Sequence, residues 1–444
     1  MEALRDGRGL AVSTRSARAL DRVEAALASL LGTRGDVGIH VEAAVRIDPD
    51  CVIAHCIRVS AMLLGLERPG APAVARALRR IDRLETRANA RERSHVAALR
   101  AWAGGDAQAA LDLYARLLDH PRDTLALHLA HALDFRLGQR EMLRERAARV
   151  LPHWRADVPH FGYVLAMYAF GLEETGDYVR AEALARRSLE IVPAHAAAMH
   201  VVAHVLEMQG RAHEGIAWLQ STRPVWSANA GFAAHLAWHL ALFHLDRGEI
   251  GAALAIHDAT LRPSAATTTA ALVDASALLW RLELRGASVG SRWNALARAW
   301  RHRSLRGRRA FDITHAVMAF AGAGHHRAAR CATGLLRGDP ATLSANAPHH
   351  LDLAIAVCEA LQAFGHADYA LAVDRIAAVR TLAEQCGGSV AQCDVINLTF
   401  LEAALRGRRT RLARALAAER SARKPRSLLN RWLFARAGAA ESAS

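Results

Sequence analysis

Two pairs of histidines have the clearest potential for chemistry in this sequence. His200 and His204 lie four residues apart in an apolar stretch that ends in a glycine, and His235 and His239 repeat this arrangement 35 residues later. Residues four apart share one face of an α-helix, so each stretch would present two imidazoles on an otherwise apolar surface. Neutral imidazoles bind zinc, copper or iron, and imidazole is also the usual acid or base in catalysis near neutral pH.

The spacing alone does not establish a metal site in a chain with 23 histidines. Val201 occupies the position at which the H-E-x-x-H pattern of metalloproteases carries its glutamate. The E-x-x-H pattern of di-iron bundles is absent from both stretches. We therefore predict no cofactor and keep a transition metal as the weaker alternative, with four candidate ligands: His200, His204, His235 and His239.

Acid–base catalysis without a metal is a further alternative. A carboxylate would have to orient an imidazole and fix its tautomer, and the candidates for this role are Glu207, Asp274, Asp312 and Asp394. No G-x-S-x-G motif supplies a nucleophile, and Cys393, beside Asp394, is the one residue that could serve as one. The sequence therefore leaves open whether the protein is an enzyme.

Helices must position these residues. Alanine, leucine and arginine recur with a helical period almost throughout the chain, and alternating β-branched residues are scarce. Turn signals recur every 33 to 42 residues, at Gly65, Gly105, Gly138, Gly176, Gly210, Gly248, Gly286, Gly324, Gly365 and Gly407. A small residue often follows about five positions later, as at Ala110, Ala181, Ala253 and Ala370. The pattern predicts an all-α fold, a superhelical array of degenerate helix-turn-helix repeats.

The composition permits a large buried core, with 52% hydrophobic and 23% charged residues. Lys424 is the only lysine, so arginine supplies nearly all of the 57 basic residues behind the net charge of +14. The arginine runs at 301–309 and 406–411 lack interleaved aromatic residues, so we interpret them as solvated turns and expect no nucleic-acid partner. A scaffold that binds acidic partners through its arginines remains a weaker interpretation.

Several features bear on location. The first residues, MEALRDGRGL, lack the apolar core of a signal peptide, and no uncharged run reaches membrane-spanning length. The six cysteines form no C-x-x-C motif, and we expect all of them to be reduced thiols: Cys51, Cys56, Cys331, Cys358, Cys386 and Cys393. These features predict a cytoplasmic protein without membrane insertion.

The clearest repeat unit is LAMYAFGLEETGDYVRAEALARRSLEIVP, residues 165–193. Its G-D-Y turn at 176–178 and its Ala181 resemble the tetratricopeptide repeat, whose unit is about 34 residues. Blocks in order along most of the chain resemble tetratricopeptide repeat protein 38: residues 121–138, 151–178, 199–208, 235–249, 282–293, 311–320 and 387–397. This resemblance implies an α-superhelix and an intracellular location, and it implies no activity. The arginine-rich surface and the C-terminal end depart from the family's pattern.

Tetratricopeptide repeats turn positions two, five and nine of the first helix towards a concave groove when the turn glycine is numbered fifteen. Histidine recurs at position five, and further polar residues fall at or beside the other positions. The candidate groove residues are His55, His95, His128, His200, His204, His235, Trp238, His239, Asp312, His315, Asp394 and Asn397. Alternatively, each histidine is a core residue bonded to a backbone carbonyl. That alternative is favoured for any single histidine, and both interpretations stay open for the set.

The ends of the chain differ from its body. Residues 1–15 are polar and predict an N-terminal extension, and residues 434–444 predict a disordered tail. Residues 16–433 then form a single superhelical domain. We expect this domain to bind a peptide or small polar ligand in a histidine-lined concave groove. The alternative is an intracellular enzyme that uses the same histidines and aspartates for acid–base chemistry, with or without a metal. The sequence does not determine the oligomeric state.

Overall fold

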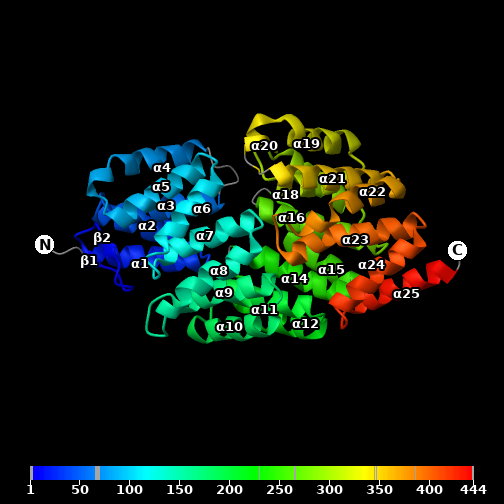
Figure 1. Cartoon of the computed structure of the whole chain (residues 1–444), viewed down its shortest axis with the longest axis horizontal. Coiled ribbons are helices and arrows are strands. Elements are labelled where there is room, and N and C mark those ends of the chain that lie inside the picture. The colour runs from blue at the N-terminus through cyan, green and yellow to red at the C-terminus, as the bar shows by residue number, and fades with distance from the viewer. Residues whose placement is uncertain are drawn as a thin grey trace. The chain divides into compact units, whose positions relative to one another are not determined.

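The computed structural model describes residues 4–65, 71–229, 231–264, 267–344, 346, 348–385 and 387–442. These residues are helical apart from turns, loops and one antiparallel pair of two-residue strands, β1 (Leu4–Arg5) and β2 (Ala11–Val12) (Figure 1). The expected all-α fold of helix-turn-helix repeats is therefore confirmed. Among the described residues, no helix has both the length and the apolar character needed to cross a lipid bilayer.

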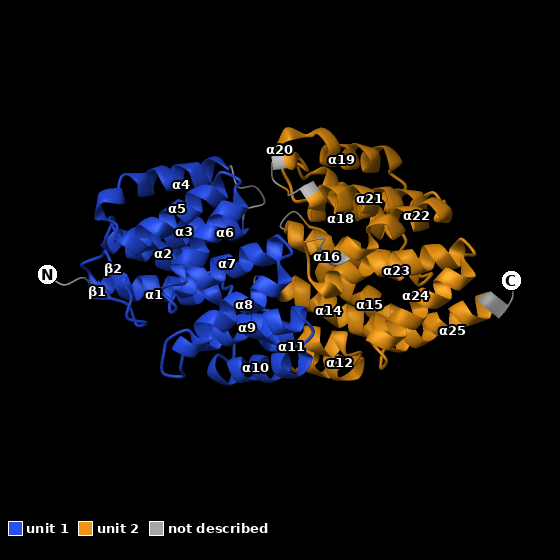
Figure 2. Cartoon of the chain, viewed as in Figure 1, with its two compact units in different colours: residues 1–202, 224–232 blue, residues 203–223, 233–444 orange. Residues whose placement is uncertain are grey.

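The helices form two compact units (Figure 2). Unit 1 comprises residues 1–202 and 224–232, and unit 2 comprises residues 203–223 and 233–444. The helices of unit 1 are α1 (Ala17–Leu31), α2 (Val37–Ile47), α3 (Val52–Gly65), α4 (Pro72–Asp82), η1 (Glu85–Arg87), α5 (Ala90–Ala103), α6 (Ala107–Leu117), α7 (Thr124–Arg136), α8 (Arg140–Val150), η2 (Leu151–His153), α9 (Phe161–Glu174) and α10 (Tyr178–Ile191). The unit boundary divides α11 (Ala196–Met208) and α13 (Arg223–Trp226).

Unit 2 contains the remaining helices. They are α12 (Ala212–Ser221), α14 (Ala233–Asp246), α15 (Ile250–Ile256), η3 (His257–Leu261), α16 (Thr269–Leu284), α17 (Arg292–Arg301), α18 (Ala310–Gly322), α19 (His326–Gly338), α20 (Pro340–Ser344), α21 (Pro348–Gly365), α22 (Tyr369–Val379), η4 (Arg380–Gln385), α23 (Val390–Arg406), α24 (Thr410–Arg423) and α25 (Leu428–Ser442). Each unit has its own cluster of buried apolar side chains. The prediction of a single superhelical domain for residues 16–433 stays a prediction, because a repeat array is held mainly by contacts between neighbours and can form two compact units without a linker.

The predicted turns fall between paired helices. At Gly176 (φ +87°) and Gly210 (φ +68°) the backbone is left-handed, a conformation that glycine adopts without the Cβ clash of other residues. The same left-handed geometry occurs at five more of the expected turn glycines: Gly105, Gly138, Gly248, Gly286 and Gly324. Near Gly365 and Gly407, the left-handed residue is instead the nearby Ala367 or Arg408.

The residue five positions after a left-handed turn marks where the two helices approach closely. Ala110, Ala181 and Ala253 occupy this position and are fully buried. After Gly210 the equivalent residue is Gly215, where an added Cβ would lie 2.3 Å from the Phe243 ring. A small residue at this position lets the two helices approach closely, which explains the recurrence of alanine in the sequence.

The expectation for Ala370 is wrong by two residues. Because the turn is left-handed at Ala367 rather than Gly365, the equivalent position is Ala372, which is fully buried, while Ala370 is exposed. The turn conformation, and not the glycine itself, therefore sets the register of the second helix.

Residues 4–12, which lie within the expected N-terminal extension, are folded. Arg8 is buried, and its guanidinium pairs with Asp6 at 2.5 Å and with Glu24 of α1 at 2.9 Å. The Asp6 carboxylate also accepts hydrogen bonds from the backbone nitrogens of Arg8 and Leu10. These charge-assisted bonds fold residues 4–12 back onto the first helix, so polar composition here does not mean disorder.

The predicted disordered tail, residues 434–444, is helical as far as Ser442, where α25 ends. Leu433 and Ala437, four residues apart, bury one face of this helix. The expectation of reduced cysteines is also wrong at one position: Cys393 is disulfide-bonded, whereas Cys51, Cys56, Cys331 and Cys358 are free thiols. Cys386 lies outside the described residues.

Alanine substitutions at two turn glycines should differ in cost. A Cβ at Gly176 meets nothing within 4 Å, so Gly176→Ala should lose only about 1–2 kcal/mol for the left-handed conformation. At Gly210 a Cβ would also lie 2.7 Å from the backbone nitrogen of Ser427. Urea denaturation should therefore show a larger loss for Gly210→Ala. Equal losses in the two variants would contradict the close approach at Gly210.

Candidate functional site

Two of the candidate groove histidines are core residues of unit 1. The His55 ring nitrogen Nε2 donates to the Pro49 carbonyl at 2.9 Å, and this imidazole is 2% exposed. His95 is fully buried, and its Nε2 lies 2.8 Å from Oδ2 of Asp123, which Arg91 also contacts at 2.8 Å. Both imidazoles are therefore held by partners within unit 1.

His128 and His200 belong to unit 1, and His200 packs against aromatic rings. The His200 ring centroid is 5.9 Å from that of Phe170 and 5.2 Å from that of Phe232. Burial lowers the pKa of His128 from 6.5 to about 4, and burial together with the nearby His128 lowers that of His131 to about 3. The imidazoles of His128 and His131 are thus neutral at pH 7.

Three of the predicted histidines meet in unit 2. His204 comes from α11, and His235 and His239 come from successive turns of α14. One nitrogen from each of the three rings lies within 4.8 Å of the others. The His239 ring centroid is 4.6 Å from that of His204 and 4.8 Å from that of His235. We call these three side chains the imidazole cluster; His200 precedes His204 by one turn of α11 but belongs to unit 1.

Two carboxylates hold the imidazole cluster from outside. Nδ1 of His239 lies 2.9 Å from Oε2 of Glu207, and Nδ1 of His235 lies 2.9 Å from Oδ2 of Asp274 on α16. A carboxylate accepts the Nδ1–H proton, so each bond fixes the tautomer whose lone pair is on Nε2. Glu207 and Asp274 thus take the orienting role that the sequence suggested for a carboxylate, although neither was a groove candidate.

An aromatic and a cationic side chain border the imidazole cluster. Trp238 is fully buried, its ring stacks on His235 with centroids 5.3 Å apart, and the Arg281 guanidinium lies 5.3 Å from its centroid. Burial holds the pKa of His239 well below its usual value, and His204, His235, Arg281 and Lys424 lower it further. His239 is therefore neutral at pH 7.

The other candidates lie elsewhere in unit 2. Asp312 pairs with Arg309 at 2.7 Å, three residues earlier on the chain, and Asp394 pairs with both terminal nitrogens of Arg420 at 2.5 and 2.9 Å. His315 Nδ1 donates to the Phe311 carbonyl at 2.8 Å, the arrangement expected of a core histidine. Asn397, on α23, is half-buried. The structure does not bring these four side chains into the imidazole cluster.

A second feature of unit 2 is a cavity of about 70 Å³ between α14, α16, α23, α24 and α25. Glu207 lines it, so one residue borders both the cavity and the imidazole cluster. Its basic lining residues are Arg281, Arg285, Arg420 and Lys424, and its acidic ones include Asp246 and Asp394. One water needs about 10–15 Å³ of such volume, so this cavity can take several waters or one small polar group.

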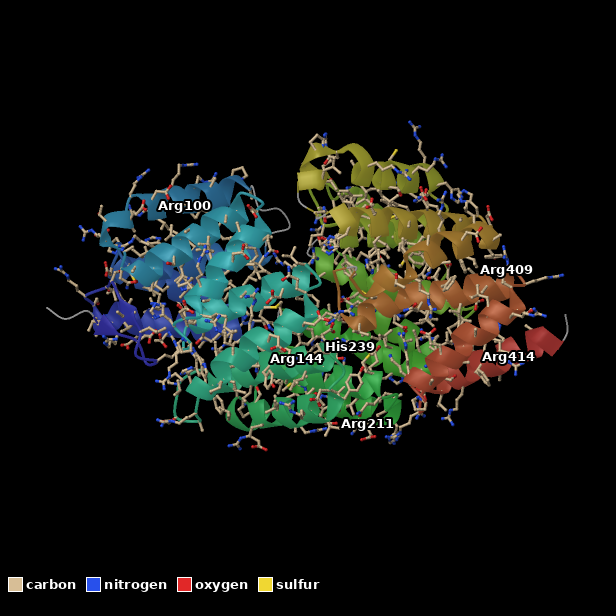
Figure 3. All side chains as sticks on the ribbon, in the orientation of Figure 1. Arg100, Arg144, Arg211, His239, Arg409 and Arg414 are labelled. Carbon is tan, nitrogen blue, oxygen red and sulfur yellow. The ribbon has the colours of Figure 1, made fainter. Side chains whose placement is uncertain are left out.

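Sequence reasoning missed the basic residues of this cavity. Arg281 and Arg285 are four residues apart at the end of α16, but this spacing does not stand out in a sequence with so many arginines. Lys424 is distinctive in the sequence only as its single lysine, and no motif places it in a site. Most other arginines, such as Arg100 and Arg409, are exposed; Figure 3 labels both, with His239 for comparison.

No family model matches this chain. Among solved structures, it is similar to the human IFIT1 dimer with PPP-AAAA, with a TM-score of 0.41, 13% identity, and coverage of 96% of this chain and 94% of that chain. A second similar structure is the human IFIT1 dimer with m7Gppp-AAAA, with a TM-score of 0.38, 14% identity, and coverage of 89% and 95%. At these TM-scores the similarity carries no argument about ligand or activity. The resemblance to tetratricopeptide repeat protein 38 and the cytoplasmic location stay predictions.

The neutral histidines of unit 1 make stability depend on pH. Burial lowers the pKa of His128 to about 4 and those of His131 and His195 to about 3, from 6.5. The unfolded chain therefore binds more protons, and stability should fall as the pH drops below 6.5, by up to about 1.4 kcal/mol per pH unit for each histidine. Denaturation between pH 7 and 5 measures this slope before most carboxylates titrate.

Removing one of these histidines should make the stability of the protein depend less steeply on pH. His131→Leu deletes one titrating group, whereas the matched variant His213→Leu changes an exposed histidine of α12. Between pH 7 and pH 5, we expect His131→Leu to lose less stability than wild type. We expect His213→Leu to lose as much stability as wild type. Stability that stays constant in wild type from pH 7 to 5 would show that these imidazoles are not held neutral.

Proposed function

We propose that unit 2 is a tetratricopeptide-type binding module that takes a small polar ligand through an anionic group, a carboxylate or a phosphate. The binding place is the cavity beside α16. This proposal keeps the peptide or small polar ligand expected from the sequence. It moves the binding place from a continuous histidine-lined groove to a cavity rich in arginine.

Arg281 and Arg285 are the observation that carries the proposal. Arg281 donates to the carbonyls of Ala277 and Ala391, at 3.2 and 2.8 Å, and lies over Trp238. Arg285 lies 4.0 Å from the Trp432 centroid, and its buried Nη1 has no hydrogen-bond partner among the described residues. Backbone carbonyls and indole rings thus hold these cations in place.

An anion would complete this arrangement. A buried guanidinium nitrogen without an acceptor costs free energy, and a planar guanidinium binds carboxylate or phosphate in a bidentate manner. By contrast, Arg420 in the same cavity already has a bidentate carboxylate partner in Asp394. Arg285 is therefore the residue to which a ligand anion would bind.

The acidic residues that line the same cavity suit a donor group on the ligand. Asp246 accepts a hydrogen bond from the Ser427 hydroxyl and one from the Leu428 backbone nitrogen at 3.1 Å, and burial raises its pKa. Glu207 lies 4.0 Å from Lys424. A ligand with an amine and a carboxylate would match the acidic and the basic residues of the cavity, and a volume of about 70 Å³ admits the end of a peptide but not a whole one.

Catalysis by the imidazole cluster has less support than binding. The Glu207–His239 and Asp274–His235 bonds resemble the orienting pairs of acid–base sites. However, a catalytic imidazole works best with a pKa near the working pH, and burial holds that of His239 far below it. The enzyme alternative stays a prediction.

Ligand binding can be tested by calorimetry on the full chain. The panel is inorganic phosphate, a dicarboxylate, a nucleoside monophosphate, and one short peptide with its C-terminus either free or amidated. We expect a member with a free anionic group to bind and Arg285→Gln to weaken that binding about 10-fold or more, the effect of losing a charged hydrogen bond. Preference for the free over the amidated peptide would identify a terminal carboxylate as the ligand group, whereas phosphate binding alone would identify phosphate.

Arg409→Gln is the matched control, because Arg409 is exposed and lies outside the cavity. It should bind like wild type. Binding that is equally strong in Arg285→Gln, or no binding of any panel member at millimolar concentration, would refute the proposal. Arg281 is unsuitable for this test, since its bonds to the carbonyls of α23 hold two helices together.

A further inference from the structure

We propose that His204, His235 and His239 bind a divalent transition-metal ion of the zinc class. Glu207 borders both this site and the ligand cavity, but the two sites use different groups: imidazole nitrogens would bind the metal, whereas guanidinium groups and carboxylates line the cavity. It also differs from the proposed function in its ligand, so either proposal can fail alone.

The first support is convergence. His204 comes from α11 and the other two histidines come from α14, yet one nitrogen from each ring lies within 4.8 Å of the others. A tetrahedral ion with metal–nitrogen distances of 2.0–2.1 Å would place its donors about 3.3 Å apart. The rings must therefore move inward by roughly 1 Å, which rotation about side-chain bonds can supply. His235 has the most room to move, since its side chain is 19% exposed and the other two are fully buried.

The second support is the pair of carboxylates behind the imidazoles. Histidines that bind metals usually donate their other ring N–H to a carboxylate or a carbonyl, which fixes the tautomer and orients the ring. Glu207 does this for His239 and Asp274 does it for His235, both at 2.9 Å. Both bonds use Nδ1, so both rings direct the lone pair of Nε2 away from their carboxylate. Two such pairs within one cluster favour a metal site over simple packing of three rings.

The donor set selects the class of ion. Imidazole nitrogens suit Zn²⁺, Cu²⁺, Ni²⁺ and Fe²⁺, whereas Mg²⁺ and Ca²⁺ require oxygen donors. Glu207 and Asp274 are already bonded to the imidazoles of His239 and His235, so they serve as orienting groups. A site with three histidines leaves one tetrahedral position for water or for a group of a bound molecule.

A second pair of imidazoles on unit 2 provides a matched control. His326 and His366 have ring centroids 4.0 Å apart and lie nearer the surface, where they could bind metal adventitiously. His366 Nδ1 donates to a backbone carbonyl, that of Gln362, rather than to a carboxylate. The double variant His326→Ala/His366→Ala removes this pair without touching the imidazole cluster.

The test uses full-length protein without a polyhistidine tag, stripped with a chelator and then dialysed against Zn²⁺ or Co²⁺. We expect about one equivalent of Zn²⁺ by elemental analysis, and a Co²⁺ absorption spectrum typical of tetrahedral coordination. His239→Ala and His204→Ala should lose both signals, and the His326→Ala/His366→Ala variant should retain both. Mg²⁺ should not compete. Arg285→Gln, which tests the ligand cavity, should leave metal binding unchanged.

Two conservative variants guard against the case in which a histidine variant fails to fold. Glu207→Gln and Asp274→Asn keep the side-chain size and should weaken Zn²⁺ binding about 10- to 100-fold. Circular dichroism establishes that each variant is folded. The proposal is overturned if wild type binds neither Zn²⁺ nor Co²⁺ at micromolar concentration. It is equally overturned if binding persists in His239→Ala and disappears in the His326→Ala/His366→Ala variant.

Discussion

The close approach of two helices within each repeat is the constraint on which the rest of this structure depends. The turn is left-handed, and in most repeats the fifth residue after it is small; at Gly215 even one extra carbon would overlap the Phe243 ring. Where the fifth residue is large, as at Leu143, the facing helix supplies the small residue: a Cβ on Gly171 would lie 2.4 Å from the backbone nitrogen of Arg144. Close packing of this kind fixes which side of each first helix faces its neighbours, and so fixes where its polar residues lie.

Polar residues on those buried faces must find hydrogen-bond partners, because an unpaired polar group away from water is costly. His55 and His95 do so with a carbonyl and a carboxylate of their own surroundings. His235 and His239 also use carboxylates, but their rings additionally meet each other and His204. The difference between a satisfied core histidine and a candidate ligand is therefore whether several imidazoles converge, and not whether each one is bonded.

The C-terminal helices complete the cavity of unit 2. The Ser427 hydroxyl donates to Asp246, 181 residues earlier in the chain, and the Leu428 backbone nitrogen donates to the same carboxylate. Arg281 of α16 donates to the carbonyl of Ala391, 110 residues later. These long-range bonds connect α23 to α16, and the start of α25 with the residue before it to α14. This explains why the segment around Lys424 contributes to a candidate site although no motif marked it.

The sequence by itself determined the repeated helix pairs, because glycine and alanine at fixed spacing report directly on left-handed turns and close helix contacts. It also indicated the two histidine pairs, since a spacing of four places side chains on one helix face. It could not determine that His95 pairs with Asp123, that Glu207 and Asp274 bond to His239 and His235, or that residues 4–12 fold onto α1. Only the tertiary structure decided these points. A helical period specifies which residues share a face, whereas the partner across that face depends on how helices distant in the sequence are packed.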